Sequence, residues 1–352
     1  MADTVKIGGR VVGAGHPCYV LAEAGVNHNG DWDLAVELVR AAKRAGADAV
    51  KFQTFRTDRL ITASAPKAAY QLRTTDGAES QTAMLRRLEM PDDWHARLIA
   101  LCHDEGIEFL STPYSFEDVD LLVSMGVKAL KLASIHCAEP PFVAYAAKTG
   151  LPLILATGMA TLAEVDAAVR AARSAGNDQV VVLQCTTDYP SRLEDANVRT
   201  LPVMRQAFQL PVGYSDHTET QIPCVAAVAL GACLVEKHLT LDRSMPGPDH
   251  AASFDPVQFA ALVTAIRETE QCLGSGVKEP CAVEVQNAKT MRRSLAARRD
   301  LKAGEVLAEA DVALLRPASG LRPYLLPELL GRRLVRDVAA GTPFRLGDFD
   351  GE

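Results

Sequence analysis

The sequence lacks closely spaced cysteine pairs, because its eight cysteines are never fewer than nine positions apart. A zinc ribbon or a dithiol redox motif needs two cysteines only a few residues apart, so both kinds of site are excluded. We therefore expect reduced thiols that are mostly buried as small hydrophobic groups.

The sequence also lacks the signals of a membrane or exported protein. It contains no continuous apolar run of about 18 residues, the length that a membrane helix requires. Its first residues, MADTVKIGG, do not place a basic segment before an apolar one, as a signal peptide does. We expect a soluble cytoplasmic protein.

An excess of positive charge is absent as well. The chain has 37 basic and 44 acidic residues, which gives a net charge of −7. Binding to nucleic acid or to a membrane surface needs clustered positive charge, so neither partner is expected. The hydrophobic content of 48% is enough for a packed core, and small-molecule chemistry fits this composition best.

What the sequence does contain is a series of eight short apolar runs, each followed by a polar tip and a stretch of helical periodicity. The predicted strands are Tyr19–Gly25, Ala49–Phe55, Glu108–Pro113, Ala129–Ile135, Pro152–Gly158, Val180–Thr186, Pro211–His217 and Leu234–Leu239. Among the helices, Thr161 and Glu164 form a capping box. The last helix has a cap at Asp255, proline at position 256 and a glycine stop at position 274.

Eight strands alternating with helices over about 260 residues predict a closed (β/α)8 TIM barrel, because an open doubly wound sheet usually has fewer strands. We assign residues 1–275 to this catalytic barrel and residues 276–290 to a linker. The remaining segment, 291–352, has short alternating runs broken by glycine and proline. It is predicted to form a second, small, β-rich domain.

Polar residues terminate every predicted strand, and the active site of a TIM barrel lies at the carboxyl ends of its strands. The candidates are Glu23, Lys51, Gln53, Ser111, Thr112, Lys131, Ser134, Thr157, Gln184, Thr186, Thr187, Ser215, Asp216, His217, Glu236, Lys237 and His238. A barrel that needed only stability would avoid so many buried polar groups, since an unpaired buried charge costs several kcal/mol.

Two histidines form the most specific pair. His217 and His238 end neighbouring strands, which lie about 4.8 Å apart, so both imidazoles can reach one cation. With only two protein nitrogens, water and substrate would complete the coordination of Mn²⁺ or a similar ion that polarises a carbonyl group. Side-chain parity places Glu236 and Ser215 beside these histidines as supporting groups.

Lys51 and Lys131 predict an anionic substrate, because a buried lysine is rarely left without a partner. Hydroxyl groups and helix N-termini at the strand tips are suited to phosphate. A different possibility is a Schiff-base aldolase or lyase that acts on pyruvate through a lysine, although an imine route needs no metal. A third is a sugar-binding module without catalytic activity.

Two carboxylates complete the site. Glu23 is the best candidate for acid–base chemistry or for placing a water molecule. Asp249 lies at the end of a proline-containing loop that follows the eighth strand, and we expect it to face the hydroxyl groups of a sugar.

Several ordered motifs closely resemble those of the sialic acid synthase family, which includes N-acetylneuraminate, legionaminate and pseudaminate synthases. They are Glu23-Ala-Gly-Val-Asn-His-Asn-Gly30, Lys51-Phe-Gln53, Leu110-Ser-Thr-Pro113, Lys131-Leu-Ala-Ser134, Thr157-Gly-Met159, Gly213-Tyr-Ser-Asp-His217, Glu236-Lys-His238 and Gly247-Pro-Asp249. Residues 291–352 resemble the family's antifreeze-like SAF domain, a β-clip fold, so the resemblance covers essentially the whole chain.

The resemblance implies that phosphoenolpyruvate condenses with an N-acetylated hexosamine to give a nine-carbon 2-keto-3-deoxy sugar acid and phosphate, by cleavage of a C–O bond. His217 and His238 would bind Mn²⁺, Mg²⁺ or Co²⁺, and Glu23 would handle protons and water. The residues implied for phosphoenolpyruvate are Lys51, Gln53, Thr112, Lys131, Ser134, Thr157 and Ser215.

The same resemblance implies that Tyr189, Asp249, Thr187 and Arg316 of the partner subunit contact the acceptor sugar, within a homodimer that is domain-swapped through the SAF domain. Thr187 stands where the family commonly has a sugar-facing asparagine. The segment after Ser134 also departs from the family pattern. The acceptor therefore stays open between N-acetylmannosamine and a modified or 6-deoxy derivative.

Overall fold

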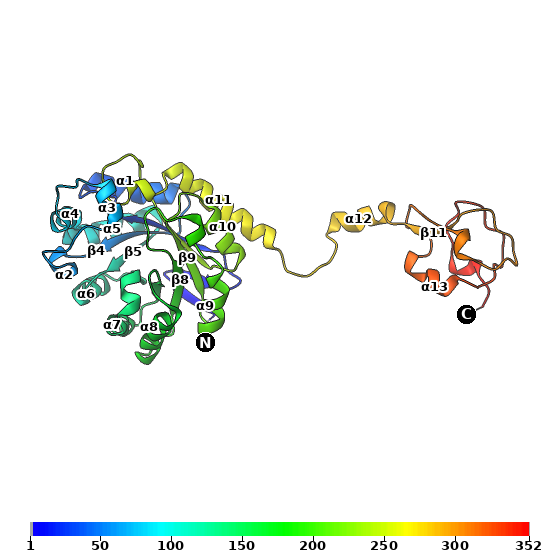
Figure 1. The fold of residues 1–352 in the computed structure, drawn as a ribbon, viewed down its shortest axis with the longest axis horizontal. Helices are drawn as coiled ribbons and strands as arrows, with labels where there is room; N and C mark the ends of the chain where they lie inside the picture. The colour runs from blue at the N-terminus through cyan, green and yellow to red at the C-terminus, as the bar shows by residue number, and fades with distance from the viewer. Residues whose placement is uncertain (1–2, 352) are drawn as a thin grey trace. The chain divides into compact units, whose positions relative to one another are not determined.

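The computed structural model describes residues 3–351 and separates the chain into two compact units. The first unit ends at Gly274 and the second begins at Ser275. Figure 1 shows the helices and strands of each unit.

The first unit is the predicted TIM barrel. Its eight strands are β3 (Tyr19–Gly25), β4 (Ala49–Thr54), β5 (Glu108–Pro113), β6 (Leu130–Leu132), β7 (Leu153–Ala156), β8 (Val180–Cys185), β9 (Val212–Asp216) and β10 (Leu234–His238). They are hydrogen-bonded in the order β5-β4-β3-β10-β9-β8-β7-β6, and every pair is parallel. The first strand of the series therefore pairs with the last, and β5 and β6 pack together where the ring closes.

All eight predicted strands are confirmed, with small differences at their ends. The largest concerns β6, which stops at Leu132 because Ser134–Ala138 turns into a 3-10 helix, η1. Both predicted helix caps are present: the Thr161 hydroxyl accepts a hydrogen bond from the Glu164 N–H, and the Asp255 carboxylate caps the last barrel helix.

The helices that follow the strands form the outer layer of the barrel (Figure 1). They are α1 (Trp32–Arg44), α5 (Asp92–Glu105), α6 (Phe116–Ser124), α7 (Pro140–Ala147), α8 (Leu162–Ser174), α9 (Thr200–Phe208), α10 (Ile222–Ala229) and α11 (Pro256–Leu273). Their buried apolar residues pack against the outward-facing residues of the strands in one continuous core.

An N-terminal hairpin, which the sequence analysis did not predict, closes one end of the barrel. Strands β1 (Thr4–Ile7) and β2 (Arg10–Gly13) pair antiparallel. Val5, Ile7 and Val12 belong to the same buried cluster as inward-facing strand residues such as Leu21 and Leu110. This packing covers inward-facing strand residues at the amino-terminal end of the barrel.

The connection from β4 to α5 is longer than the other connections and carries three short helices. They are α2 (Thr57–Leu60), α3 (Ala69–Thr74) and α4 (Gln81–Leu88). Met84 and Leu88 of α4 form a small separate core with Val26 and Phe55, which follow β3 and β4. This core attaches the helical connection between β4 and α5 to the carboxyl end of the barrel.

The second unit is small and built mainly of loops and short strands. It contains α12 (Ala282–Met291), the antiparallel pair β11 (Ser294–Ala297) and β12 (Val312–Leu315), and α13 (Leu326–Leu329). Leu295, Leu301, Leu334 and Phe344 belong to its own buried core. Helix α12 covers most of the segment that was predicted to be a linker.

Short 3-10 helices occur in both units. In the first unit they include Leu193–Asp195 and His250–Ala252, and in the second they are Glu309–Asp311, Pro323–Leu325 and Leu346–Asp348.

No helix among residues 3–351 is both long enough and apolar enough to cross a bilayer.

A buried ion pair joins the ends of β9 and β10 on their outer face. The Lys237 ammonium lies 2.6 Å from the Asp216 carboxylate, and neither side chain is exposed. Asp216 also accepts hydrogen bonds from Tyr214 and Thr218, while the ammonium lies 4.2 Å from the centre of the Phe254 ring. Both charges therefore have the partners that burial requires.

We predict that Lys237→Met lowers the free energy of unfolding by about 3–5 kcal/mol, because the Asp216 carboxylate would stay buried without its cation. The double variant Asp216→Asn/Lys237→Met removes both charges and should recover most of this loss. Urea unfolding followed by tryptophan fluorescence measures the barrel specifically, since both tryptophans, Trp32 and Trp94, lie in it. A single variant as stable as the wild type would show that the pair does not stabilise the barrel.

Candidate active site

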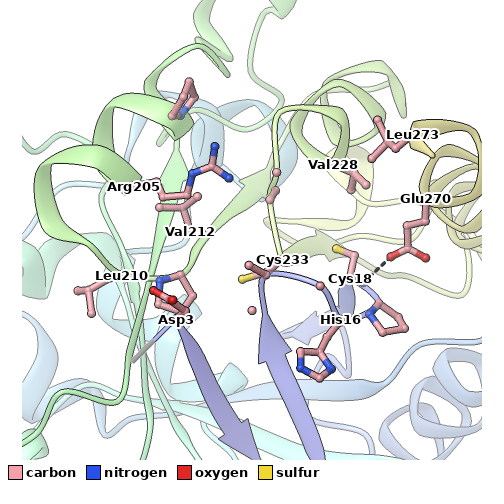
Figure 2. Close-up of a pocket in the computed structure, with 18 of the residues that line it drawn as sticks. Asp3, His16, Cys18, Arg205, Leu210, Val212, Val228, Cys233, Glu270 and Leu273 are labelled. Atoms are coloured by element: carbon pink, nitrogen blue, oxygen red, sulfur yellow. Dashed lines mark hydrogen bonds between the residues drawn. The ribbon is translucent and has the colours of Figure 1, made fainter. Parts of the chain in front are cut away.

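The barrel has cavities at both ends, and the larger one lies at the amino-terminal end. It has a volume of about 1030 Å³ and is lined by segments that precede β3, β9 and β10, including Cys18, Pro211 and Cys233. Figure 2 shows its labelled side chains, with the hydrogen bond from the Cys18 N–H to the Glu270 carboxylate. None of the polar strand ends proposed as site residues lines this cavity.

The second cavity, of about 450 Å³, lies at the carboxyl ends of the strands. It brings together most of the residues predicted from the sequence. These are Glu23, Lys51, Gln53, Thr112, Lys131, Ser134, Thr187, Tyr189, Ser215, His217, His238 and Asp249, and Glu236 lies with them. Because these side chains come from seven of the eight strands or from the loops after them, the cavity has the placement expected of a TIM-barrel active site.

Side-chain parity separates these residues from other strand-end candidates that do not reach the cavity. Successive residues of a strand point to opposite faces. Asp216 and Lys237 therefore point toward the helices and bind each other, whereas their neighbours His217 and His238 point inward. Ser111 is likewise buried on the outer face, where its hydroxyl lies 2.6 Å from that of Thr54.

Gln184 and Thr186 donate to the backbone carbonyls of Ala196 and Asp195 and do not line the cavity. Of the residues to which the family resemblance gave a role, Thr157 and Arg316 are not placed in the cavity. The Thr157 hydroxyl donates to the carbonyl of Leu183 at 2.8 Å, and Thr157 is not among the residues that line the cavity. The next residue, Gly158, donates its N–H to the Ser134 hydroxyl at 3.0 Å. Arg316 belongs to the second unit, so its predicted contact with a partner subunit remains a prediction.

Glu23 and Lys51 form a buried ion pair at the floor of the cavity. The Lys51 ammonium lies 2.5 Å from one Glu23 oxygen, and the Gln53 amide donates to the other at 3.1 Å. Lys51 also donates to the Thr112 hydroxyl at 2.9 Å. Burial raises the pKa of Glu23, and the nearby charge of Glu236 adds to this, so the two outweigh the opposing effect of Lys51.

A second ion pair lies beside the first. Lys131 is 3.3 Å from Glu236, whose same oxygen accepts a hydrogen bond from Ser215 at 3.2 Å. Burial opposes ionisation of Glu236, but Lys131, Lys51 and His217 outweigh it and lower its pKa. The pKa values of these two neighbouring carboxyl groups are thus shifted in opposite directions. Glu23 is suited to carry or exchange a proton, and Glu236 is suited to stay charged.

His217 and His238 lie together, with ring centres 5.3 Å apart. The Tyr189 ring packs against both histidines. The Nδ1 atom of His217 lies 2.6 Å from the Thr186 carbonyl oxygen, to which it donates, so in the neutral form of this ring Nε2 carries the free lone pair. Burial lowers the pKa of His238 well below its usual value, and the nearby lysine ammonium groups add to this effect, which favours the neutral ring.

A neutral imidazole with a free lone pair is what a divalent metal ion requires, and a backbone carbonyl on the other ring nitrogen is a common support for such a ligand. Among residues 3–351, no group of three or more histidine, cysteine, aspartate or glutamate side chains is arranged to hold a metal ion. The two histidines therefore fit a weakly held ion that depends on further ligands from water or substrate.

The roof of the cavity contains residues that the sequence analysis missed. Tyr70 and Gln71 of α3 and Met84 of α4 line it, and the Tyr70 ring lies 4.9 Å from that of Tyr189. None of these residues ends a strand, which was the criterion used. The one sequence signal that could have indicated them is the long segment between the second and third predicted strands.

Asp249 also lines the cavity, and only 6% of its surface is exposed. Burial and the negative charge of Glu23 raise its pKa to about 6. A carboxyl group with this pKa binds its proton more tightly in the folded chain than in the unfolded chain, where it titrates near pH 4. The folded state therefore loses stability as the pH rises from about 4 to about 6.

We predict that Asp249→Asn removes this pH-dependent loss. The variant should match the wild type near pH 4 and exceed its free energy of unfolding by up to about 3 kcal/mol above pH 6, at about 1.4 kcal/mol per pKa unit. Urea unfolding at pH 4.5 and pH 8 measures the difference. If the two proteins differ by the same amount at both pH values, the Asp249 carboxyl group does not titrate as described.

Comparisons with known proteins agree with this geometry. Residues 38–278 match the NeuB family, and residues 292–350 match the SAF domain. The chain is 43% identical to N,N'-diacetyllegionaminic acid synthase of Legionella pneumophila, over 97% of this chain and 98% of that protein. It is 35% identical to pseudaminic acid synthase of Campylobacter jejuni, over 94% and 96% of the two chains.

Among solved structures, N-acetylneuraminic acid synthetase from Leptospira borgpetersenii superposes with a TM-score of 0.74 at 30% identity. The match covers 82% of this chain and 95% of that one. The resemblance that the motifs indicated is thus confirmed over both units. The chain belongs to the sialic acid synthase, or NeuB, family and carries that family's SAF domain after its barrel.

Proposed function

We propose that this enzyme condenses phosphoenolpyruvate with an N-acetylated hexosamine and releases phosphate, giving a nine-carbon sugar acid of the sialic acid type. The observation that carries the proposal is one cavity that combines two buried lysines, two carboxyl groups whose pKa values are shifted in opposite directions, and a pair of histidines. The names of the relatives, which are synthases of legionaminic, pseudaminic and N-acetylneuraminic acid, support a product of this class.

Lys51 and Lys131 are the groups we assign to the phosphate and carboxylate of phosphoenolpyruvate. Both ammonium groups are buried. Lys51 donates to the Thr112 hydroxyl, and Lys131 pairs with the Glu236 oxygen that also accepts from the Ser215 hydroxyl. Charge-assisted hydrogen bonds of this kind are about twice as strong as neutral ones. Gln53 and Ser134 line the same part of the cavity, and we include Thr157 as a neighbour that supports Gly158 and Ser134 through the backbone.

Glu23 is assigned to proton transfer. In the reaction, C3 of phosphoenolpyruvate forms a bond to the aldehyde carbon of the sugar, whose oxygen takes up a proton. Water adds at C2 and loses a proton, and the C2–O bond to phosphate then breaks to leave the keto group. Because burial raises the pKa of Glu23, this side chain is better suited than an ordinary carboxylate to give and accept a proton.

The metal proposed for the histidine pair is Mn²⁺, with Mg²⁺ and Co²⁺ as alternatives. When bound by His217 and His238, it would supply a Lewis acid for the aldehyde oxygen. Tyr189, Thr187 and Asp249 line the same cavity, and we assign them to the sugar. We also propose a homodimer in which Arg316 of the partner subunit completes the sugar site. Phosphoenolpyruvate is a cytoplasmic metabolite, so we propose the cytoplasm as the location.

The strongest alternative, a Schiff-base aldolase or lyase acting on pyruvate, is disfavoured by the lysines themselves. Lys237 points away from the cavity, and Lys51 and Lys131 are each held in an ion pair with a carboxylate, so none of the three has a free amino group that faces a substrate. Borohydride reduction in the presence of pyruvate distinguishes the two reactions. Covalent labelling of any of these lysines would favour the aldolase.

We predict that the enzyme releases phosphate from phosphoenolpyruvate only when a suitable N-acetylated hexosamine and Mn²⁺ are both present. A colorimetric phosphate assay against a panel that includes N-acetylmannosamine and 2,4-diacetamido-6-deoxy hexoses measures this. Absence of phosphate release with every sugar would reject the proposed reaction and favour a sugar-binding module.

For the histidine pair, we predict that His217→Ala weakens Mn²⁺ binding at least about tenfold, because one of only two protein ligands is lost. Calorimetric titration of the variant with Mn²⁺ measures the affinity without turnover. His95→Ala is a matched control, since His95 is a buried barrel histidine that does not line the cavity. Equal Mn²⁺ affinity of the His217 variant and the wild type would remove His217 from the ligand set.

A further inference from the structure

The loop that follows β10, residues 239–255, is fastened to the loop that follows β3 by two asparagine side chains. The Asn27 amide donates to the Leu239 carbonyl and to the Ser253 hydroxyl, both at 2.9 Å. The Asn29 amide donates to the Pro246 carbonyl, also at 2.9 Å. These three bonds join segments that lie more than 200 residues apart in the sequence.

The same contacts extend to Asp249. The Ser253 hydroxyl, which accepts from Asn27, donates to the Asp249 carbonyl at 2.7 Å. The next residue, His250, is fully buried, and its Nδ1 lies 2.6 Å from the Thr240 hydroxyl. The backbone on either side of the Asp249 side chain is therefore fixed by side chains that do not themselves line the cavity.

Close packing at Gly247 shows how tightly the two loops meet. This glycine has φ +155°, and a Cβ atom placed there would lie 2.6 Å from the His250 ring and 2.9 Å from the side-chain amide oxygen, Oδ1, of Asn29. Only a residue without a side chain leaves room for both neighbours. Asn29 itself has φ +52°, a left-handed conformation that asparagine adopts more readily than most residues.

We propose that Asn27, Asn29, Gly247 and His250 form a latch that holds Asp249 at the place where the acceptor sugar binds. Asn29 is then a positioning residue for acceptor recognition, and it acts through Pro246 and the loop rather than by touching the sugar. The consequence for the acceptor rests on the proposed function. The latch itself rests only on the contacts between the two loops.

The loop needs such a latch because it is long. At its base, the loop is closed by the pairing of Leu239 with Phe254 beside β3. A loop of this length that is tied only at its base opens easily. Apart from the asparagines, Thr74 of α3 donates to the Pro248 carbonyl at 3.3 Å, and Arg243 within the loop donates to the Ala251 carbonyl at 2.8 Å. The two asparagine amides supply partners along the loop, at Pro246 and at Ser253, and thus on both sides of Asp249.

The test is Asn29→Gly, which removes the amide and keeps the left-handed backbone. A matched control is Asn197→Gly, because Asn197 also has a positive φ, of +42°, is exposed and does not line the cavity. Hydrogen exchange followed by mass spectrometry should be faster in residues 239–255 of the Asn29 variant and unchanged there in the control. Unchanged exchange in that loop in the Asn29 variant would overturn the latch.

Steady-state kinetics test the consequence for the acceptor. With N-acetylmannosamine, or whichever hexosamine of the panel the wild type uses best, Asn29→Gly should raise the acceptor KM about tenfold or more, the loss expected for one weakened hydrogen bond to a charged group. The KM for phosphoenolpyruvate should not change. A purely structural role would lower kcat through loss of active enzyme and leave both KM values alone, and that result would overturn the positioning role.

Gly247→Ala provides a second variant, whose added methyl group must push apart Asn29 and His250. It should affect loop exchange and acceptor KM in the same direction as Asn29→Gly, and wild-type values for both would contradict the latch. If the exchange results hold but the wild type releases no phosphate with any hexosamine, the proposed function fails while the latch stands.

Discussion

Two ion pairs buried in one cavity are the constraint on which the rest of this structure depends. Glu23–Lys51 and Lys131–Glu236 place four charged groups at the carboxyl ends of the strands, where they are almost completely removed from water. Burying a charge is costly unless it is paired and hydrogen-bonded. The hairpin that packs at the opposite end of the barrel and the helical connection between β4 and α5 that covers this end are what keep the charges in a confined space of about 450 Å³.

Along β9 and β10, alternate side chains face opposite sides of the sheet, so the residues that stabilise the barrel are separate from those that line the cavity. Outward-facing Asp216 and Lys237 bind each other and need no ligand, whereas inward-facing His217 and His238 lie in the cavity. Adjacent residues therefore serve different purposes. The fixed pair behind the histidines keeps the two strand ends in register, and the ring nitrogens in front remain available for a ligand.

The eight strands, the barrel and most of the cavity residues could be predicted because strand periodicity and polar strand ends are local features. Glu23, Lys51 and His238 were found in this way. Tyr70 and Gln71 could not be, since they reach the cavity through the folding of a long connection rather than through a strand. Thr157 ends a strand, yet its hydroxyl is bound to the backbone, and this outcome depends on a neighbouring strand that local sequence does not show.

In the proposed reaction, this cavity joins the enol carbon of phosphoenolpyruvate to a sugar aldehyde, and phosphate then leaves by cleavage of the C–O bond. Phosphoenolpyruvate carrying heavy oxygen in the bridge between C2 and phosphorus tests this directly. After turnover with the preferred hexosamine and Mn²⁺, mass spectrometry should find the label in the released phosphate. Released phosphate without the label would mean that the P–O bond breaks instead, and would contradict the account.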